Sequence, residues 1–280
     1  YFRRRICPKM DTTRLMQIAL DLVDFKTVPD DSAIYVPGEG IQRLLFGLDI
    51  GTAELLMARE LGYDAVIAHH PVGVPHRAWR VFERHVALLT AAGVPEEAAR
   101  AAVAPKMATL RLNGMVTNYE QVPMAARRLG MPFMNVHAPL DELGRRVMQS
   151  AVDVLLLSAP DATLRDVVTV LGMLPAAQRA AVPIEVLLGA PGARAGKTLV
   201  CHGAYTNGGD GVARACFQHG IDTVIYIHIA PGDLESLRRD GRGQLIVTGH
   251  LLGDAFGIGP YISALRSQGL EVDVLSEVLA

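Results

Sequence analysis

The chain has 280 residues, of which 50% are hydrophobic, so it can bury a sizeable core in one large or two ordinary domains. Its formal net charge of −2 provides no broad basic surface, and we expect no nucleic acid partner. No apolar stretch approaches the roughly 20 residues that span a bilayer, and the 3 cysteines form no C-x-x-C pair, which excludes a transmembrane segment and a disulfide framework and favours the cytoplasm.

The first residues carry positive charge without the apolar run of an export signal. Met10 fits a natural initiator, and residues 1–9 then form an upstream segment that takes no part in the fold. We therefore assign residues 1–11 to an N-terminal extension.

Short β-branched runs alternate with helical patterns along the rest of the chain. The expected strands are 44–50, 65–69, 133–137, 184–188, 198–202, 223–229, 244–248 and 270–275. The expected helices are 12–26, 52–61, 78–92, 96–110, 119–129, 141–157, 162–173, 210–219, 231–239 and 254–268. This alternation predicts an α/β fold with mostly parallel strands and a site at the strands' carboxyl ends.

Residues 51–70 resemble residues 209–228 when the two segments are aligned without gaps, and His70 then matches His228. We interpret this as two related α/β halves, although helix-glycine-strand joints also resemble one another by composition. The segment between the halves has helical periodicity and no strand signal. We expect a core formed by residues 12–75 and 136–280, with a helical insertion at residues 76–135.

Two adjacent histidines, His69 and His70, end one expected strand and precede Pro71. Consecutive side chains on a strand point to opposite faces, so both imidazoles reach one centre only where the backbone turns. Pro71 favours such a turn because it removes a ladder donor and holds His70 extended. A helix-capping or core pair is the alternative interpretation.

Two further signals pair a histidine with an acid four residues later. His137 ends a strand before Asp141, which is either a ligand or the N-cap of the next helix. His250 and Asp254 follow another strand, and their spacing places them on one face of a helix, where they could hold a metal.

These signals all lie at the ends of expected parallel strands, where an α/β sheet places its site. Imidazoles mixed with carboxylates suit Zn, Mn, Fe or Co, and a bridging carboxylate can hold two such ions about 3.5 to 4 Å apart. The sequence therefore predicts a site for two divalent metal ions, with these ligands: His69, His70, Asp141, His250 and Asp254.

Other residues could assist such a site. His137, His202 and His228 each end a strand and could be a proton donor, a supporting partner or an extra ligand; we favour His228 and His137 as catalytic groups. Free amides at Gly208, Gly209 and Gly211 could bind an anion, or form a tight turn capped by Asp210. The remaining histidines, His76, His85 and His219, are expected at the surface.

Several motifs occur in an order that resembles the Nif-three-like dinuclear-metal proteins, whose bacterial members are often labelled GTP cyclohydrolase I type 2. The motifs are Gly47-Leu-Asp49, His69-His70-Pro71, His137-Ala-Pro-Leu-Asp141 and Gly249-His250 with Asp254. The resemblance extends from about residue 12 to the end. It implies two similar α/β domains, the same five ligands, and a ring-shaped homo-oligomer, commonly a hexamer.

The sequence departs from this family at two places. Asp254 stands where glutamate is usual, and Tyr226-Ile227-His228 replaces a frequent Thr-Gly-Glu. We therefore expect a divergent branch with a different substrate pocket.

Two hypotheses for function follow. The first is a metal-dependent hydrolase that acts on a small substrate, such as a nucleotide or another phosphorylated compound. The second is a metal-binding oligomeric protein with a regulatory or interaction role and no catalysis.

Overall fold

The computed structural model describes residues 10–279. Residues 1–9 of the predicted extension lie outside the described residues, whereas Asp11 caps the first helix by accepting a hydrogen bond from the amide of Arg14.

The strands are β1 (Ala33–Val36), β2 (Arg43–Gly47), β3 (Ala65–Ala68), β4 (Phe133–Asn135), β5 (Glu185–Leu188), β6 (Thr198–Val200), β7 (Thr223–Tyr226), β8 (Gln244–Val247) and β9 (Glu271–Val274). The α-helices are α1 (Thr12–Asp21), α2 (Thr52–Glu60), α3 (Pro75–Ala78), α4 (Arg84–Ala91), α5 (Glu96–Met115), α6 (Gln121–Leu129), α7 (Ala138–Ser158), α8 (Leu164–Gly172), α9 (Gly209–Gln218), α10 (Pro231–Asp240) and α11 (His250–Ser267). The 3-10 helices are η1 (Trp79–Glu83), η2 (Pro175–Arg179) and η3 (Glu277–Leu279).

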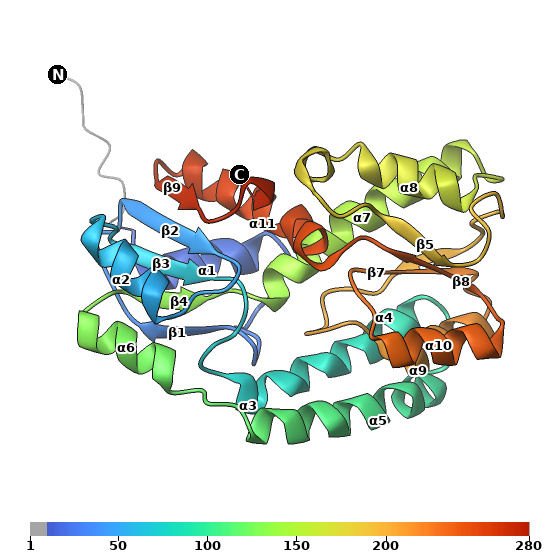
Figure 1. Cartoon of the computed structure of the whole chain (residues 1–280), viewed down its shortest axis with the longest axis horizontal. Coiled ribbons are helices and arrows are strands. Elements are labelled where there is room, and N and C mark those ends of the chain that lie inside the picture. Colours follow the sequence, from blue (N-terminus) through green and yellow to red (C-terminus); the bar gives the residue numbers. More distant parts are fainter. Residues whose placement is uncertain (1–9, 280) are drawn as a thin grey trace.

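These strands form two mostly parallel sheets, which confirms the predicted α/β class. The first has the order β1-β4-β3-β2-β9 and the second the order β5-β8-β7-β6. Only the edge strands β1 and β5 run antiparallel to their neighbours. Figure 1 shows the two sheets at opposite ends of the long axis, with α7 and α11 between them.

The two halves share one topology, because the order β1-β4-β3-β2 repeats as β5-β8-β7-β6. The predicted match of residues 51–70 with 209–228 falls on α2–β3 and α9–β7, which occupy equivalent places in the two halves. In the same way, α7 follows β4 as α11 follows β8. The chain therefore consists of two related α/β halves, as the sequence predicts.

The two equivalent helices α7 and α11 cross closely through glycines. A Cβ on Gly144 would lie 3.1 Å from the amide nitrogen of Gly257, and a Cβ on Gly257 would collide with the carbonyl oxygen of Leu140. Side chains at these positions would separate the helices. Each glycine comes three residues after an acid, Asp141 or Asp254, so the crossing brings both acids to the centre of the molecule.

The segment between the halves, residues 76–135, packs partly against the second half and partly against the first. Its helices η1, α4 and α5 supply Phe82, Leu89 and Val103, which pack in one core with Val212 and Val224 of the second half. By contrast, α6 packs with the first half, and β4 is an inner strand of the first sheet. None of the helices in residues 10–279 combines the length and apolarity that crossing a membrane requires.

One histidine prediction is wrong: His85 of α4 is fully buried instead of lying at the surface. Its Nε2 is 3.0 Å from the carbonyl oxygen of Thr206, to which it donates. Burial, aided by the positive charge of Lys106, lowers the pKa of His85 to about 4. The helical period alone did not reveal the loop that covers this face of α4.

The buried His85 leads to a prediction for pH dependence. Between its folded pKa of about 4 and its unfolded value of about 6.5, the unfolded chain binds more protons, so acid destabilises the fold. Full protonation of His85 would lower the free energy of unfolding by roughly 3 kcal/mol. The groups that face His85 are Thr206, Lys106, His202 and Arg84. His85→Gln keeps a donor for Thr206 without titrating, and we expect it to lose less stability on acidification.

Urea unfolding of both proteins at pH 7.5 and 4.5, with a chelator present, checks this expectation. The difference between the two proteins isolates the contribution of His85. Equal losses of unfolding free energy in the two proteins would contradict it.

Candidate metal centre

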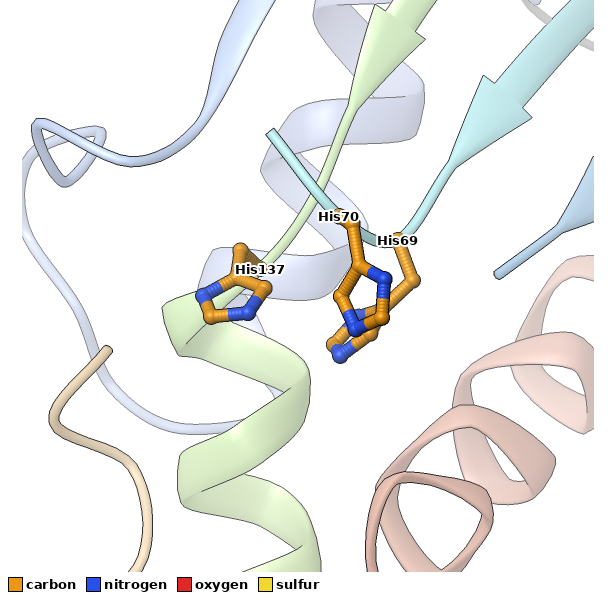
Figure 2. Close-up of side chains that lie close together, drawn as sticks. All are labelled: His69, His70 and His137. Carbon is orange, nitrogen blue, oxygen red and sulfur yellow. The ribbon is translucent and has the colours of Figure 1, made fainter. Parts of the chain in front are cut away.

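The first half supplies three histidines from the carboxyl ends of neighbouring strands. The amides of His69 and His70 donate to the carbonyls of Gly47 and Leu48, which extends the pairing of β3 with β2 up to Pro71. His137 lies where β4 turns into α7. Figure 2 shows the three imidazoles gathered at this edge of the sheet, and their ligand atoms lie within 4.8 Å of one another.

The second half contributes two residues of α11, His250 and Asp254, to the same cluster. Gly249 has a φ of +89°, a left-handed conformation that lets the chain turn directly from β8 into the helix. His250 and Asp254 then lie one turn apart on the same side. The imidazole of His250 is 5.0 Å from that of His70, centre to centre, so the two halves meet here.

Two buried carboxylates lie at the centre of this cluster. The Oδ1 of Asp141 is 3.1 Å from the Nε2 of His69. The Oδ2 of Asp254 is 3.2 Å from the Nε2 of His250 and 3.5 Å from the Nε2 of His70. Ligands of one ion, each about 2.1 Å from it, lie roughly 3 to 4 Å apart, and these distances match that spacing.

Oxygen acceptors orient the three histidines of the first half. The Nδ1 atoms donate over 3.0 Å from His69 to the carbonyl of Val136, and over 2.7 Å from His70 to Asp49. His137 donates from Nδ1 to the buried Asp31 over 2.8 Å. Each of these contacts uses Nδ1 and leaves Nε2 available, which is the arrangement typical of metal-ligating histidine.

Several buried polar atoms in the cluster have no hydrogen-bond partner within the described residues. They are His69 Nε2, Asp141 Oδ1, His202 Nε2 and Asp254 Oδ2. Such atoms normally find partners because leaving them without one costs roughly 1 to 3 kcal/mol each. A divalent cation would satisfy all four, so the residues present fit a metal ion.

The two buried carboxylates also carry negative charge that a bound cation would neutralise. Burial opposes ionisation of Asp141, but neighbouring histidines, His137 first, overcome burial and lower the pKa of Asp141 to about 2. The pKa of Asp254 likewise falls well below its ordinary value, because His69 outweighs burial. Burial disfavours charge on His69, yet the two carboxylates raise the pKa of His69 to about 10. One imidazolium offsets only part of two buried negative charges.

His228 lies at the edge of the cluster, with its ring 4.9 Å from that of His250. Its Nδ1 accepts a hydrogen bond of 2.8 Å from the side-chain amide of Asn207. The orientation of that amide is fixed because its oxygen accepts from Lys106 and from the amide of Gly209. Burial, together with the charge of His250, lowers the pKa of His228 to about 4. His228 is therefore neutral at pH 7, with its proton on Nε2.

The glycine turn predicted to bind an anion lies next to His228. Gly208 precedes α9, Gly209 has a φ of +67°, and the amide of Gly209 already donates to Asn207. Lys106 brings a positive charge to this turn, and Asp233 lies 3.7 Å from that charge. Anion binding at Gly208, Gly209 and Gly211 stays a prediction.

Two orienting residues, Asp31 and Asp49, were not proposed from the sequence as functional residues. Asp49 belongs to the Gly47-Leu-Asp49 motif directly after β2, and that position was the available signal. Asp31 lies before β1, a strand that the sequence did not predict, so nothing pointed to it. Of the other histidines expected at the surface, His76 is exposed, whereas His219 is half-buried.

Comparison with known proteins finds solved structures of similar fold. A crystal structure of a NIF3 superfamily protein from Sphaerobacter thermophilus is similar over 96% of this chain and 99% of that chain, with 45% identity and a TM-score of 0.91. Reduced HcgD from Methanocaldococcus jannaschii matches 96% of this chain and 98% of its own, with 12% identity and a TM-score of 0.59.

A Bacillus cereus protein related to NIF3 shows 9% identity and a TM-score of 0.53 over 96% of this chain and 97% of its own. The two distant structures support the fold alone. No protein-family profile matches the chain. A search of curated proteins likewise found no relative.

Proposed function

The chain belongs to the NIF3 superfamily, and from that premise we propose that it is a metal-dependent hydrolase with a dinuclear site for Zn, Mn, Fe or Co. The proposed ligands are those predicted from the sequence: His69, His70, Asp141, His250 and Asp254. Bound divalent cations would polarise the scissile group of a substrate and acidify a water molecule.

One observation carries this proposal. Three histidines in one cluster donate from Nδ1 to oxygen acceptors, and two of them, His69 and His70, turn Nε2 toward the buried carboxylates of Asp141 and Asp254. A set of core histidines would instead pair both nitrogens with protein groups or leave one in solvent. This pattern therefore favours a metal centre over a packed core.

The orientation of His228 defines its proposed role. Because Asn207 occupies Nδ1, the neutral ring offers an N–H at Nε2, so His228 would donate a hydrogen bond or a proton to the substrate and would not act as a base. His137 is held by Asp31, which stabilises a positive charge on its ring. These properties suit His137 as a group that accepts a proton.

Substrate would approach from the exposed side of the site. The side chain of His250 is 48% exposed, whereas that of His69 is fully buried. His250 also lines a cavity of about 390 Å³ together with Val182 and Leu252. Lys106 and the turn at Gly208–Gly211 would receive a phosphate or carboxylate of the substrate on the side of His228.

The hydrolase proposal predicts turnover that depends on metal and on His70. Protein reconstituted with Mn or Zn should hydrolyse at least one member of a panel of nucleotides, phosphoesters and amides. His70→Ala should lower kcat/KM by at least about 100-fold, since removing even a group that supports a ligand costs about 10- to 100-fold. His76→Ala, an exposed histidine outside the cluster, is the matched control and should retain activity.

If wild type binds metal tightly yet the whole panel stays at background, the hydrolase proposal fails. A metal-binding regulatory or interaction role would then be the better explanation.

We further propose self-association into a ring-shaped homohexamer. Light scattering should then give a mass six times that of the chain, and a monomer at micromolar concentration would contradict it.

A further inference from the structure

A further histidine of the second half, His202, lies in the loop that follows β6. Its side chain is only 5% exposed. Its Nε2 is 3.7 Å from the Oδ1 of Asp141 and 3.9 Å from the Oδ1 of Asp254. These distances are too long for hydrogen bonds, and this nitrogen has no other partner in residues 10–279.

The chain holds His202 against the two carboxylates by close packing. The next residue, Gly203, has a φ of +79°, and a Cβ there would lie 3.0 Å from the Cα of Glu142, the neighbour of Asp141. The guanidinium of Arg84 stabilises this contact, because it donates one hydrogen bond of 2.8 Å to the carbonyl of Gly203 and another of 3.3 Å to Glu142. The loop is therefore fixed to the first turn of α7.

A core role does not account for this arrangement. His85 is also buried and its Nδ1 likewise has no partner within residues 10–279, but its Nε2 donates to the carbonyl of Thr206 and no carboxylate is among the groups that face it. His202 instead turns its Nε2 to two anions at the spacing expected of ligands that share one ion, roughly 3 to 4 Å. A buried nitrogen left without a partner costs roughly 1 to 3 kcal/mol, and a cation between these groups removes that cost.

We propose that His202 is an additional metal ligand, supplied by the second half alone. This inference rests on the proposed metal centre and extends its ligand set beyond the five residues named above. The register of the strands shows that the two halves differ here: Val200 pairs with Ile225 as Phe46 pairs with Ile67. Leu48 therefore occupies the place equivalent to His202, and an aliphatic side chain cannot bind a metal.

An added imidazole changes which ions the centre prefers. Nitrogen ligands favour Zn and Co, whereas Mn suits sites rich in carboxylate and water oxygens. His202 would therefore increase the affinity for Co or Zn more than the affinity for Mn. Removing His202 should therefore reduce the difference between the affinity for Co or Zn and the affinity for Mn.

Cobalt titration of the full chain tests the proposal, because the visible absorption of Co(II) reports the number and type of its ligands. In His202→Ala we expect the affinity for Co(II) to fall at least tenfold, the absorption spectrum to change, and the affinity for Mn to fall less. His85→Ala removes a buried imidazole that faces no carboxylate and should match wild type in both readouts. His202→Gln, closer in size, provides a second variant if alanine impairs folding.

An unchanged affinity and spectrum in both His202 variants, with wild type loaded, would overturn the role of His202 alone. Failure of wild type itself to bind cobalt would overturn the metal centre and the proposed function with it. Thermal unfolding in a chelator adds a control for a purely structural role. We expect metal-free His202→Gln to melt close to metal-free wild type, since His202 makes no hydrogen bond through Nε2.

Discussion

Gly257→Ala is expected to unfold at a much lower temperature than wild type. The new Cβ would collide with the carbonyl oxygen of Leu140, where α7 and α11 cross, and neither backbone can yield without separating the helices. Overpacking of this kind costs about 3 kcal/mol or more, which corresponds to a melting temperature roughly 6 to 10 °C lower. Because Asp141 follows Leu140, metal binding should weaken as well.

Gly259→Ala is the matched control for this experiment. It lies two residues further along α11, and apart from its chain neighbours a Cβ there would meet no atom within 4 Å. Alanine favours a helix over glycine by about 0.5 to 1 kcal/mol, but Pro260 follows and disfavours a helical residue with a Cβ before it, so we expect a small net effect. Calorimetry should therefore give a large downward shift for Gly257→Ala and little change for Gly259→Ala. A Gly257→Ala protein that melts like wild type would contradict the close crossing of the two helices.

Asp254→Asn is expected to have the largest effect on metal binding. One of its oxygens, Oδ2, lies within 3.7 Å of the Nε2 atoms of His69, His70 and His250. The amide keeps the shape of the side chain but removes the charge that a bridging ligand supplies. We expect affinity for the weaker-bound ion to fall by more than about 100-fold, beyond the 10- to 100-fold typical of supporting residues.

Asp49→Asn provides the comparison, because Asp49 only orients His70 through its Nδ1. Its effect should stay within about 10- to 100-fold. Competition against a chelator measures both affinities. An Asp254→Asn protein with affinity equal to that of Asp49→Asn would contradict a direct role for Asp254 as a ligand.

The fold was predictable where the hydrophobic pattern is strong and its partners are near in sequence. The alternation of strands and helices indicated the α/β class, and the match of His70 with His228 indicated two related halves. The pairing of β9 with β2 could not be inferred, because it joins residues more than 200 positions apart. Strand β1 was missed since all four of its residues are only half-buried.

The site was predictable in part for a similar reason. The five proposed ligands belong to short motifs at strand ends, so local spacing identified them, and the structure brings them together. The orienting residue Asp31 and the position of His202 depend on contacts between distant segments. His202 was open to several roles from the sequence, and only its distances to Asp141 and Asp254 single it out.

The metal content of the reconstituted protein tests the central claim most directly. Elemental analysis of wild type, after incubation with Zn or Mn at neutral pH and removal of free ions, should give about two divalent ions per chain, as a dinuclear site requires. His250→Ala should give fewer. A wild-type protein that retains no metal under these conditions would contradict the account.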